Sequence, residues 1–264
     1  MMALRQLILT LALTVVSAVQ VRAQSERSVH FTARQCNEDA IAIHVDPGPL
    51  QDFVDGAFSL ALEEGKARIL IVVHDCGQYW LDGVDVGPTQ EAQFWVALHG
   101  PQDVRPVIGA ERTLPTRTWF NLLSLSNNAR VREAKGGSGT VQLPIEGIAL
   151  DPPASRRGGR MKIRQDVELS WTVASAAPAA RLVGINHDVF GRDAAGKLFL
   201  NRIQVLVHPT AAPSSGTLKV VGELNALPWI PPGSYPAVIQ TFFPIWSRAA
   251  LGLVPPATGE TSLR

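Results

Sequence analysis

Three side chains capable of chemistry stand together at the end of an apolar run. They are His74, Asp75 and Cys76, within VVHDCGQYW at residues 72–80. This segment fits either a catalytic thiol with an imidazole beside it or a structural cysteine whose neighbours are incidental. The choice depends on the compartment, because thiols remain reduced in the cytosol and form disulfides in oxidising environments.

The N-terminus predicts export. Residues 1–23 contain Arg5, an apolar run over residues 7–19 and the sequence Val-Arg-Ala before Gln24, a pattern typical of a cleaved secretory signal peptide. An uncleaved membrane anchor is the alternative, but the apolar run is shorter than the roughly 20 residues of a membrane-spanning helix. We therefore expect a secreted or periplasmic protein with no integral membrane segment after cleavage.

Export changes the interpretation of the cysteines. The chain has only Cys36 and Cys76, and an even pair in an oxidising compartment most simply forms one disulfide. Closing that loop would stabilise the fold by about 4 kcal/mol. A catalytic thiol would need the other cysteine to stay reduced without a role, so we predict a Cys36–Cys76 disulfide.

Other catalytic and binding patterns are weak. His187-Asp188 repeats the His74-Asp75 pair, but neighbouring residues on a strand point to opposite faces, so neither pair forms a local couple. No HxH or HxxxH spacing predicts a metal site, and no G-x-S-x-G or phosphate-loop lysine is found. The formal net charge is +1 with no basic block. We therefore expect no metal, no cofactor and no nucleic-acid partner.

Most of the chain consists of short β-type runs separated by Gly, Pro, Asn and Asp. The expected strands lie within 40–45, 67–74, 92–100, 140–150, 160–173 and 216–224, and residues 181–209 read as a hairpin. Closely spaced strands predict a mainly β sandwich or barrel rather than βαβ units. We expect one domain over residues 24–254, followed by a disordered tail at 255–264.

Two segments have a helical pattern. Residues 49–66 place apolar side chains at 3-4 spacing before Gly65. Residues 234–253 are apolar and aromatic and contain Pro244, which predicts a kinked helix that closes one end of the barrel. The alternative for this second segment is a surface that meets a membrane or forms a homo-oligomer.

A region from Gly87 to Ala134 carries the most informative polar residues. Glu91 opens a strand, and Arg117 precedes TWFNLLSLSNNAR at residues 118–130, which passes from apolar to polar as a loop entering a cavity would. The alternative is an exposed glutamate and solvated arginines.

Three motifs in this order resemble the acetoacetate decarboxylase-like superfamily. They are VDPGPLQDFV at 45–54, GPTQEAQFWVAL at 87–98 and RTWFNLLSLSN at 117–127, and the similarity spans roughly residues 30–225. The resemblance implies a single-domain antiparallel β-barrel or cone with a few short helices and an apolar cavity. It also places Glu91 at the family's carboxylate and residues 117–127 at its lysine loop.

The departure from the family concerns its chemistry. Alignment on Trp119 puts Leu123 and Ser124 where the family has paired lysines. Such a lysine attacks a ketone as a neutral amine, because burial beside a second cation lowers its pKa. Neither leucine nor serine can form an imine, so we expect the fold to be retained without Schiff-base decarboxylation.

Two functions remain, together with a structural alternative. In the first, the barrel binds a small carboxylate- or ketone-bearing apolar molecule, with Arg34 or Arg117 as the anion partner and His74 and Trp119 in the cavity wall. In the second, a lyase or hydrolase uses Glu91 as general acid or base, assisted by Ser124 or His74. The pKa of Glu91 distinguishes them, since it is raised for a poised base and lowered for a carboxylate paired with arginine. The structural alternative is an interaction protein whose core is filled.

Overall fold

The computed structural model describes residues 28–54, 56–137, 142–151, 158–173, 181–192, 196–209, 213–223 and 225–253. The expected signal peptide at 1–23 and the expected tail at 255–264 lie outside these ranges. None of the helices within these ranges is long and apolar enough to cross a membrane.

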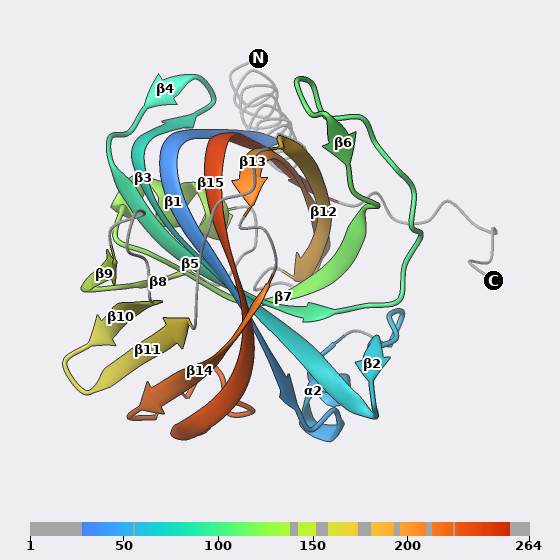
Figure 1. The fold of residues 1–264 in the computed structure, drawn as a ribbon, viewed down its shortest axis with the longest axis vertical. Helices are drawn as coiled ribbons and strands as arrows, with labels where there is room; N and C mark the ends of the chain where they lie inside the picture. Colours follow the sequence, from blue (N-terminus) through green and yellow to red (C-terminus); the bar gives the residue numbers. More distant parts are fainter. Residues whose placement is uncertain are drawn as a thin grey trace, which may run out of the picture.

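Seven strands form a closed barrel (Figure 1). In spatial order they are β1 (Val29–Val45), β3 (Lys66–Leu81), β5 (Thr89–Ala97), β7 (Arg117–Ser126), β12 (Val183–Arg192), β13 (Leu198–Pro209) and β15 (Gly233–Leu253). The ring closes because β15 also pairs with β1. All neighbours are antiparallel except β7 and β12, which run parallel. The predicted mainly β barrel is confirmed.

Beyond β15 the same hydrogen-bonded sheet continues outside the barrel, and we call this part the second sheet. It consists of β14 (Ser214–Val221), β11 (Val167–Val173), β10 (Gly158–Arg164) and β9 (Gly147–Leu150). β15 is long enough to serve both structures, since its first residues pair with β14 and its later ones with β13. In Figure 1 the second sheet lies to the lower left of the ring of barrel strands.

Four short strands and two helices complete the part of the chain that the structure describes. The strands are β2 (Leu62–Glu63), β4 (Val84–Asp85), β6 (Arg112–Thr113) and β8 (Gln142–Pro144), and the helices are α2 (Gly48–Phe53) and α3 (Ala129–Gly137). α3 packs against β7 and β8.

The main hydrophobic core lies outside the barrel lumen. Ile71, Phe94 and Leu123, on barrel strands, are fully buried in one cluster with Met161 and Trp171 of the second sheet. Since successive side chains alternate between the two faces of a strand, the opposite face of the same barrel strands lines the lumen. Strand β3 is therefore buried on both faces, as its continuous apolar run predicts. The lumen does not have to supply the principal core.

Both helix predictions are wrong in extent or type. Residues 234–253 form strand β15, and Pro244 sits where the register with β13 shifts rather than at a helix kink. The segment at 49–66 is helical only over Gly48–Phe53, and the chain then enters an isolated bridge at Leu60 and the short strand β2. Pairing with neighbouring strands satisfies the backbone of these apolar segments, and such tertiary context overrides local periodicity.

The expected loop at 118–130 is also different in the structure. Most of it is strand β7, and its last residues begin α3. The expected hairpin at 181–209 is confirmed as β12 and β13.

Candidate functional site

The barrel lumen contains a cavity of about 560 Å³. This volume lies within the range of roughly 300–1,000 Å³ that is usual for small-molecule sites. Most of its wall is apolar, and includes Leu70, Val72, Trp95, Trp119 and Ile203. The cavity can therefore accept an apolar molecule.

Cys36 and Cys76 lie directly opposite each other on β1 and β3 and form a disulfide on the cavity wall. The predicted pairing is confirmed, and no thiol is left to act as a nucleophile. The side-chain alternation shifts at Gln35, whose φ is 54°, so Ala33 and Cys36 both face the cavity. Arg34 consequently faces outward.

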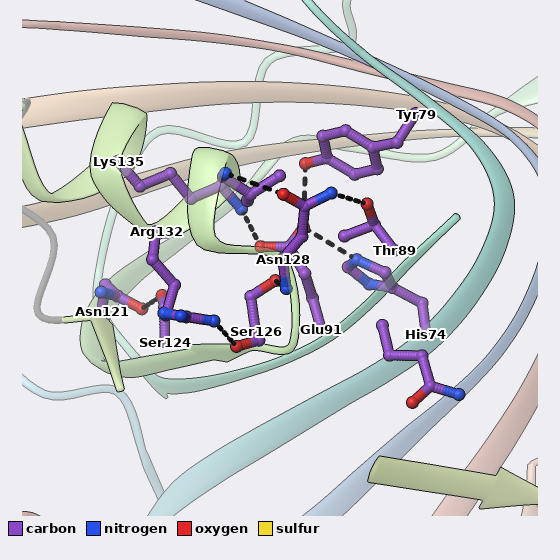
Figure 2. Close-up of polar contacts among 12 residues, drawn as sticks. His74, Tyr79, Thr89, Glu91, Asn121, Ser124, Ser126, Asn128, Arg132 and Lys135 are labelled. Carbon is purple, nitrogen blue, oxygen red and sulfur yellow. Dashed lines mark hydrogen bonds and ion pairs between the residues drawn. The ribbon is translucent and has the colours of Figure 1, made fainter. Parts of the chain in front are cut away.

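Glu91 is the centre of a polar cluster on the cavity wall (Figure 2). Its side chain has no exposed surface. The Tyr79 hydroxyl donates to Glu91 Oε2 at 2.8 Å, and His74 Nε2 lies 3.0 Å from the same oxygen. The Lys135 ammonium donates to Glu91 Oε1, and Lys135 is itself 4% exposed. Figure 2 shows Lys135, Tyr79 and His74 converging on the carboxylate.

Strand pairing and helix capping position this cluster. His74 and Glu91 are cross-strand partners on β3 and β5, which places both side chains on one face. Asn128 Oδ1 accepts hydrogen bonds from the backbone N–H groups of Arg130 and Val131 at the start of α3. Val131, fully buried, and Lys135 lie four residues apart and share the inward face of the helix.

The charges in the cluster follow from its contacts. Burial alone raises the pKa of Glu91, but the Lys135 ammonium and the hydrogen bond and charge of His74 outweigh burial and lower that pKa to about 2. Burial and the Glu91 charge hold the pKa of Tyr79 well above its usual value. At neutral pH the site therefore presents an ionised carboxylate, and its phenol remains protonated.

The other end of the cavity is lined by arginines and aromatic rings. Arg68 and Arg117 both reach the cavity wall there, beside Trp119. Trp119 Nε1 donates to His187 Nδ1 at 2.9 Å. Burial, together with the charges of Arg117 and Arg105, lowers the pKa of His187 to about 3, so its imidazole is neutral.

The structure places the six residues expected in the site in two groups. Glu91, His74, Arg117 and Trp119 line the cavity. Arg34 does not: it is exposed, and its guanidinium carbon lies 5.8 Å from the centre of the Trp80 ring. Ser124 is 2% exposed but is not part of the cavity wall, and its hydroxyl donates to Asn121 Oδ1 at 3.2 Å. This geometry leaves Ser124 without access to a ligand in the cavity.

Lys135 is the residue that sequence reasoning missed. The family resemblance directed the search for a lysine to Leu123, which instead belongs to the main core outside the lumen. A lysine does line the cavity, but it stands on α3 and not in the segment at 117–127. The asparagine cap and the Val131–Lys135 spacing were visible in the sequence, but nothing there indicated that α3 would turn this face toward Glu91.

The described residues do not form a metal site. Across the ranges that the structure describes, no group of three or more His, Cys, Asp or Glu side chains has the geometry to hold one.

Sequence and structure comparisons give different results. The sequence matches no family model and is not significantly similar to any curated protein. Solved structures are similar, however. The enduracididine biosynthesis enzyme MppR, complexed with the condensation product of pyruvate and imidazole 4-carboxaldehyde, aligns with a TM-score of 0.50 at 15% identity, over 86% of this chain and 87% of that one. An acetoacetate decarboxylase-like enzyme from Sphingomonas wittichii RW1 aligns with a TM-score of 0.48 at 11% identity, over 86% and 91%. The chain therefore shares the fold of MppR.

Proposed function

We propose that this protein binds an apolar molecule bearing a carboxylate or a ketone inside its barrel, reversibly and without forming an imine. The observation that carries the proposal is the buried Lys135–Glu91 ion pair on the wall of an otherwise apolar cavity. The lysine is held by a carboxylate instead of being freed by a second cation.

A lysine must lose its proton before it can attack a carbonyl carbon. Glu91 is ionised because its pKa is about 2, so the nearest group to Lys135 is a full negative charge. The Lys135 nitrogen also lies 5.1 Å from the centre of the Phe31 ring, and an aromatic face attracts an ammonium. Both contacts favour the charged form, which is not nucleophilic.

The enzyme alternative receives less support. A general acid or base works best when its pKa lies near the working pH. A Glu91 pKa of about 2 corresponds to a carboxylate paired with a cation, and that cation is Lys135 rather than an arginine. The alternative of a filled core is disfavoured by the cavity itself.

The MppR structure adds limited support. That protein holds the condensation product of two carbonyl compounds, but its 15% identity to this chain establishes a common fold alone. The ligand of this protein must therefore be argued from its own cavity.

Export is part of the same proposal. The Cys36–Cys76 disulfide fits an oxidising compartment, as does the signal-peptide pattern at residues 1–23. The intact mass of the protein recovered from the periplasm or medium of a producing cell should correspond to a chain starting near Gln24. Recovery of the full-length chain in the cytosol would contradict export.

The binding claim is tested by titrating the mature protein with apolar carboxylates and keto acids. Because Trp95 and Trp119 line the cavity, saturable changes in tryptophan fluorescence are expected. Sodium borohydride added to each mixture should leave the intact mass unchanged. A reduced adduct on Lys135, absent in a Lys135→Met variant, would show imine chemistry and overturn the proposal.

A further inference from the structure

We infer that the arginine end of the cavity is an anion subsite, and that the ligand is an elongated amphiphile. Its anionic head group binds Arg68 and Arg117, and its apolar chain runs toward Glu91. This inference rests on the proposed binding function and specifies the ligand class and its orientation.

The two arginines have unused hydrogen-bonding capacity. Arg68 Nη1 donates to Glu63 Oε1 at 3.1 Å, but the Arg68 Nε atom is buried without a partner. The guanidinium of Arg117 has no hydrogen-bond or ion-pair partner within the described ranges. A buried, unpaired guanidinium N–H is costly, and a carboxylate or similar anion is the group that satisfies a guanidinium best.

The local charge balance also favours an anion. Glu63 is the acidic residue at this rim, and it is shared between Arg68 and His44, whose Nε2 lies 2.8 Å from Glu63 Oε2. Arg112 contributes a third guanidinium to the cavity wall. Burial and the positive charge of Arg68 lower the pKa of Arg117, as expected for two cations held close together.

The opposite end of the cavity is less suited to an anion, which sets the orientation. The ionised carboxylate of Glu91 lies there, in contact with Lys135, His74 and Tyr79. Lys135 is already paired with Glu91, so among the cavity residues that the structure describes it is not available to a ligand anion. A head group is therefore attracted to the arginines and not to the Glu91 cluster.

The spacing along β3 sets the length of the ligand. Arg68 and His74 are six residues apart, and Leu70 and Val72 line the wall between them. At about 3.3 Å per residue, this interval is at most roughly 20 Å. A fully extended chain advances about 1.2 Å per bond, so a straight chain of roughly 12–16 carbons spans it.

Calorimetric titration with straight-chain carboxylates from hexanoate to octadecanoate, each below its aggregation concentration, tests the length. Affinity is expected to rise by up to about fourfold for each added methylene, because each one is removed from water. The rise should stop at roughly 12–16 carbons, where the chain reaches the polar cluster. Affinities that do not depend on chain length would overturn the elongated ligand.

The anion subsite is tested with dodecanoate and its methyl ester. Arg117→Gln and Arg68→Gln should each lower the affinity for dodecanoate by about tenfold, since a charge-assisted hydrogen bond is lost. The affinity for the methyl ester should not change. Arg34→Gln is the matched control, because Arg34 is an exposed arginine outside the cavity, and it should change neither affinity. Arg117→Lys should restore part of the dodecanoate affinity. Equal binding of acid and ester by the unaltered protein would overturn the anion subsite.

These outcomes separate the inference from the function on which it rests. Tight binding of carboxylates with no effect of Arg68 or Arg117 would leave a binding barrel without this subsite. No binding of any apolar carboxylate or ester would overturn both. Dodecyl sulfate and dodecyl phosphate identify the head group: tighter binding of either than of dodecanoate would replace the carboxylate with that anion in the same subsite.

Discussion

Separating Lys135 from Glu91 should destabilise the protein strongly. Both side chains are buried, at 4% and 0% exposure, so either one left alone is an uncompensated charge away from water. Removing one partner of such a pair typically costs about 3–5 kcal/mol of unfolding free energy. We expect Lys135→Met and Glu91→Gln each to lose stability in this range.

The double variant distinguishes pairing from packing. When Lys135→Met and Glu91→Gln are combined, both charges are gone and the site is neutral. The combined loss should therefore be smaller than either single loss, and the coupling energy at least about 2 kcal/mol. The exposed Lys162–Glu146 pair, 2.8 Å apart with side chains 46% and 44% exposed, is a matched control. Its Lys162→Met variant should lose less than about 1 kcal/mol.

Urea unfolding of the unaltered protein and these four variants at pH 7 measures the losses. The same experiment repeated at lower pH tests the charge of Glu91, whose pKa is about 2 in the folded protein against 4.5 for a free side chain. The ionised form is therefore favoured by folding, and contributes roughly 3 kcal/mol above pH 4.5 that is lost as the pH falls toward 2. Glu91→Gln should lack this part of the acid dependence. The reasoning would be refuted if the stability losses of the two single variants added up in the double variant. It would also be refuted if Glu91→Gln kept the full acid dependence of the unaltered protein.

Three further predictions concern other parts of the barrel. Replacing Cys36 and Cys76 with alanine should lower the unfolding free energy by about 4 kcal/mol, measured by urea unfolding against the oxidised protein, and an unchanged midpoint would contradict a stabilising disulfide. The ring resonances of His187 should stay constant between pH 5 and 8, because its pKa is about 3 in the folded state; since the unfolded imidazole takes up a proton near pH 6.5, its contribution to stability falls as the pH drops below that value. Gly191→Ala should cost about 1–3 kcal/mol in the same urea assay, because its Cβ would lie 2.2 Å from Cζ of the buried Phe199 ring, and a neutral effect would mean that this ring can move.

The β architecture could be predicted because strand patterns are local. The alternation in residues 160–173 and the apolar run at 67–74 correspond to the β10–β11 pair and to β3. The disulfide followed from the number of cysteines and the expected compartment. The segment at 234–253 could not be assigned correctly, because its type is decided by partners as distant as β1, at the other end of the chain.

Only part of the candidate site could be predicted, because local patterns do not record contacts between distant parts of the chain. Glu91 and His74 were identified because polar residues on expected strands are conspicuous, and Trp119 was identified through the family resemblance. Lys135 and Arg68 were not, because their importance arises only when the barrel closes and brings Arg68 of β3 and Lys135 of α3 to opposite ends of one cavity. An ordinary-looking lysine or arginine acquires a role through contacts that no local pattern records.

The central claim is that the barrel holds an apolar carboxylate or ketone without covalent attachment. A crystal structure of the mature protein with 11-oxododecanoate, which carries both groups and would place its ketone near Lys135, tests it most directly. The account predicts one ligand in the lumen, its carboxylate between Arg68 and Arg117, with the Lys135–Glu91 ion pair intact. A covalent bond from Lys135 Nζ to the keto carbon, or side chains filling the lumen and excluding the ligand, would contradict it.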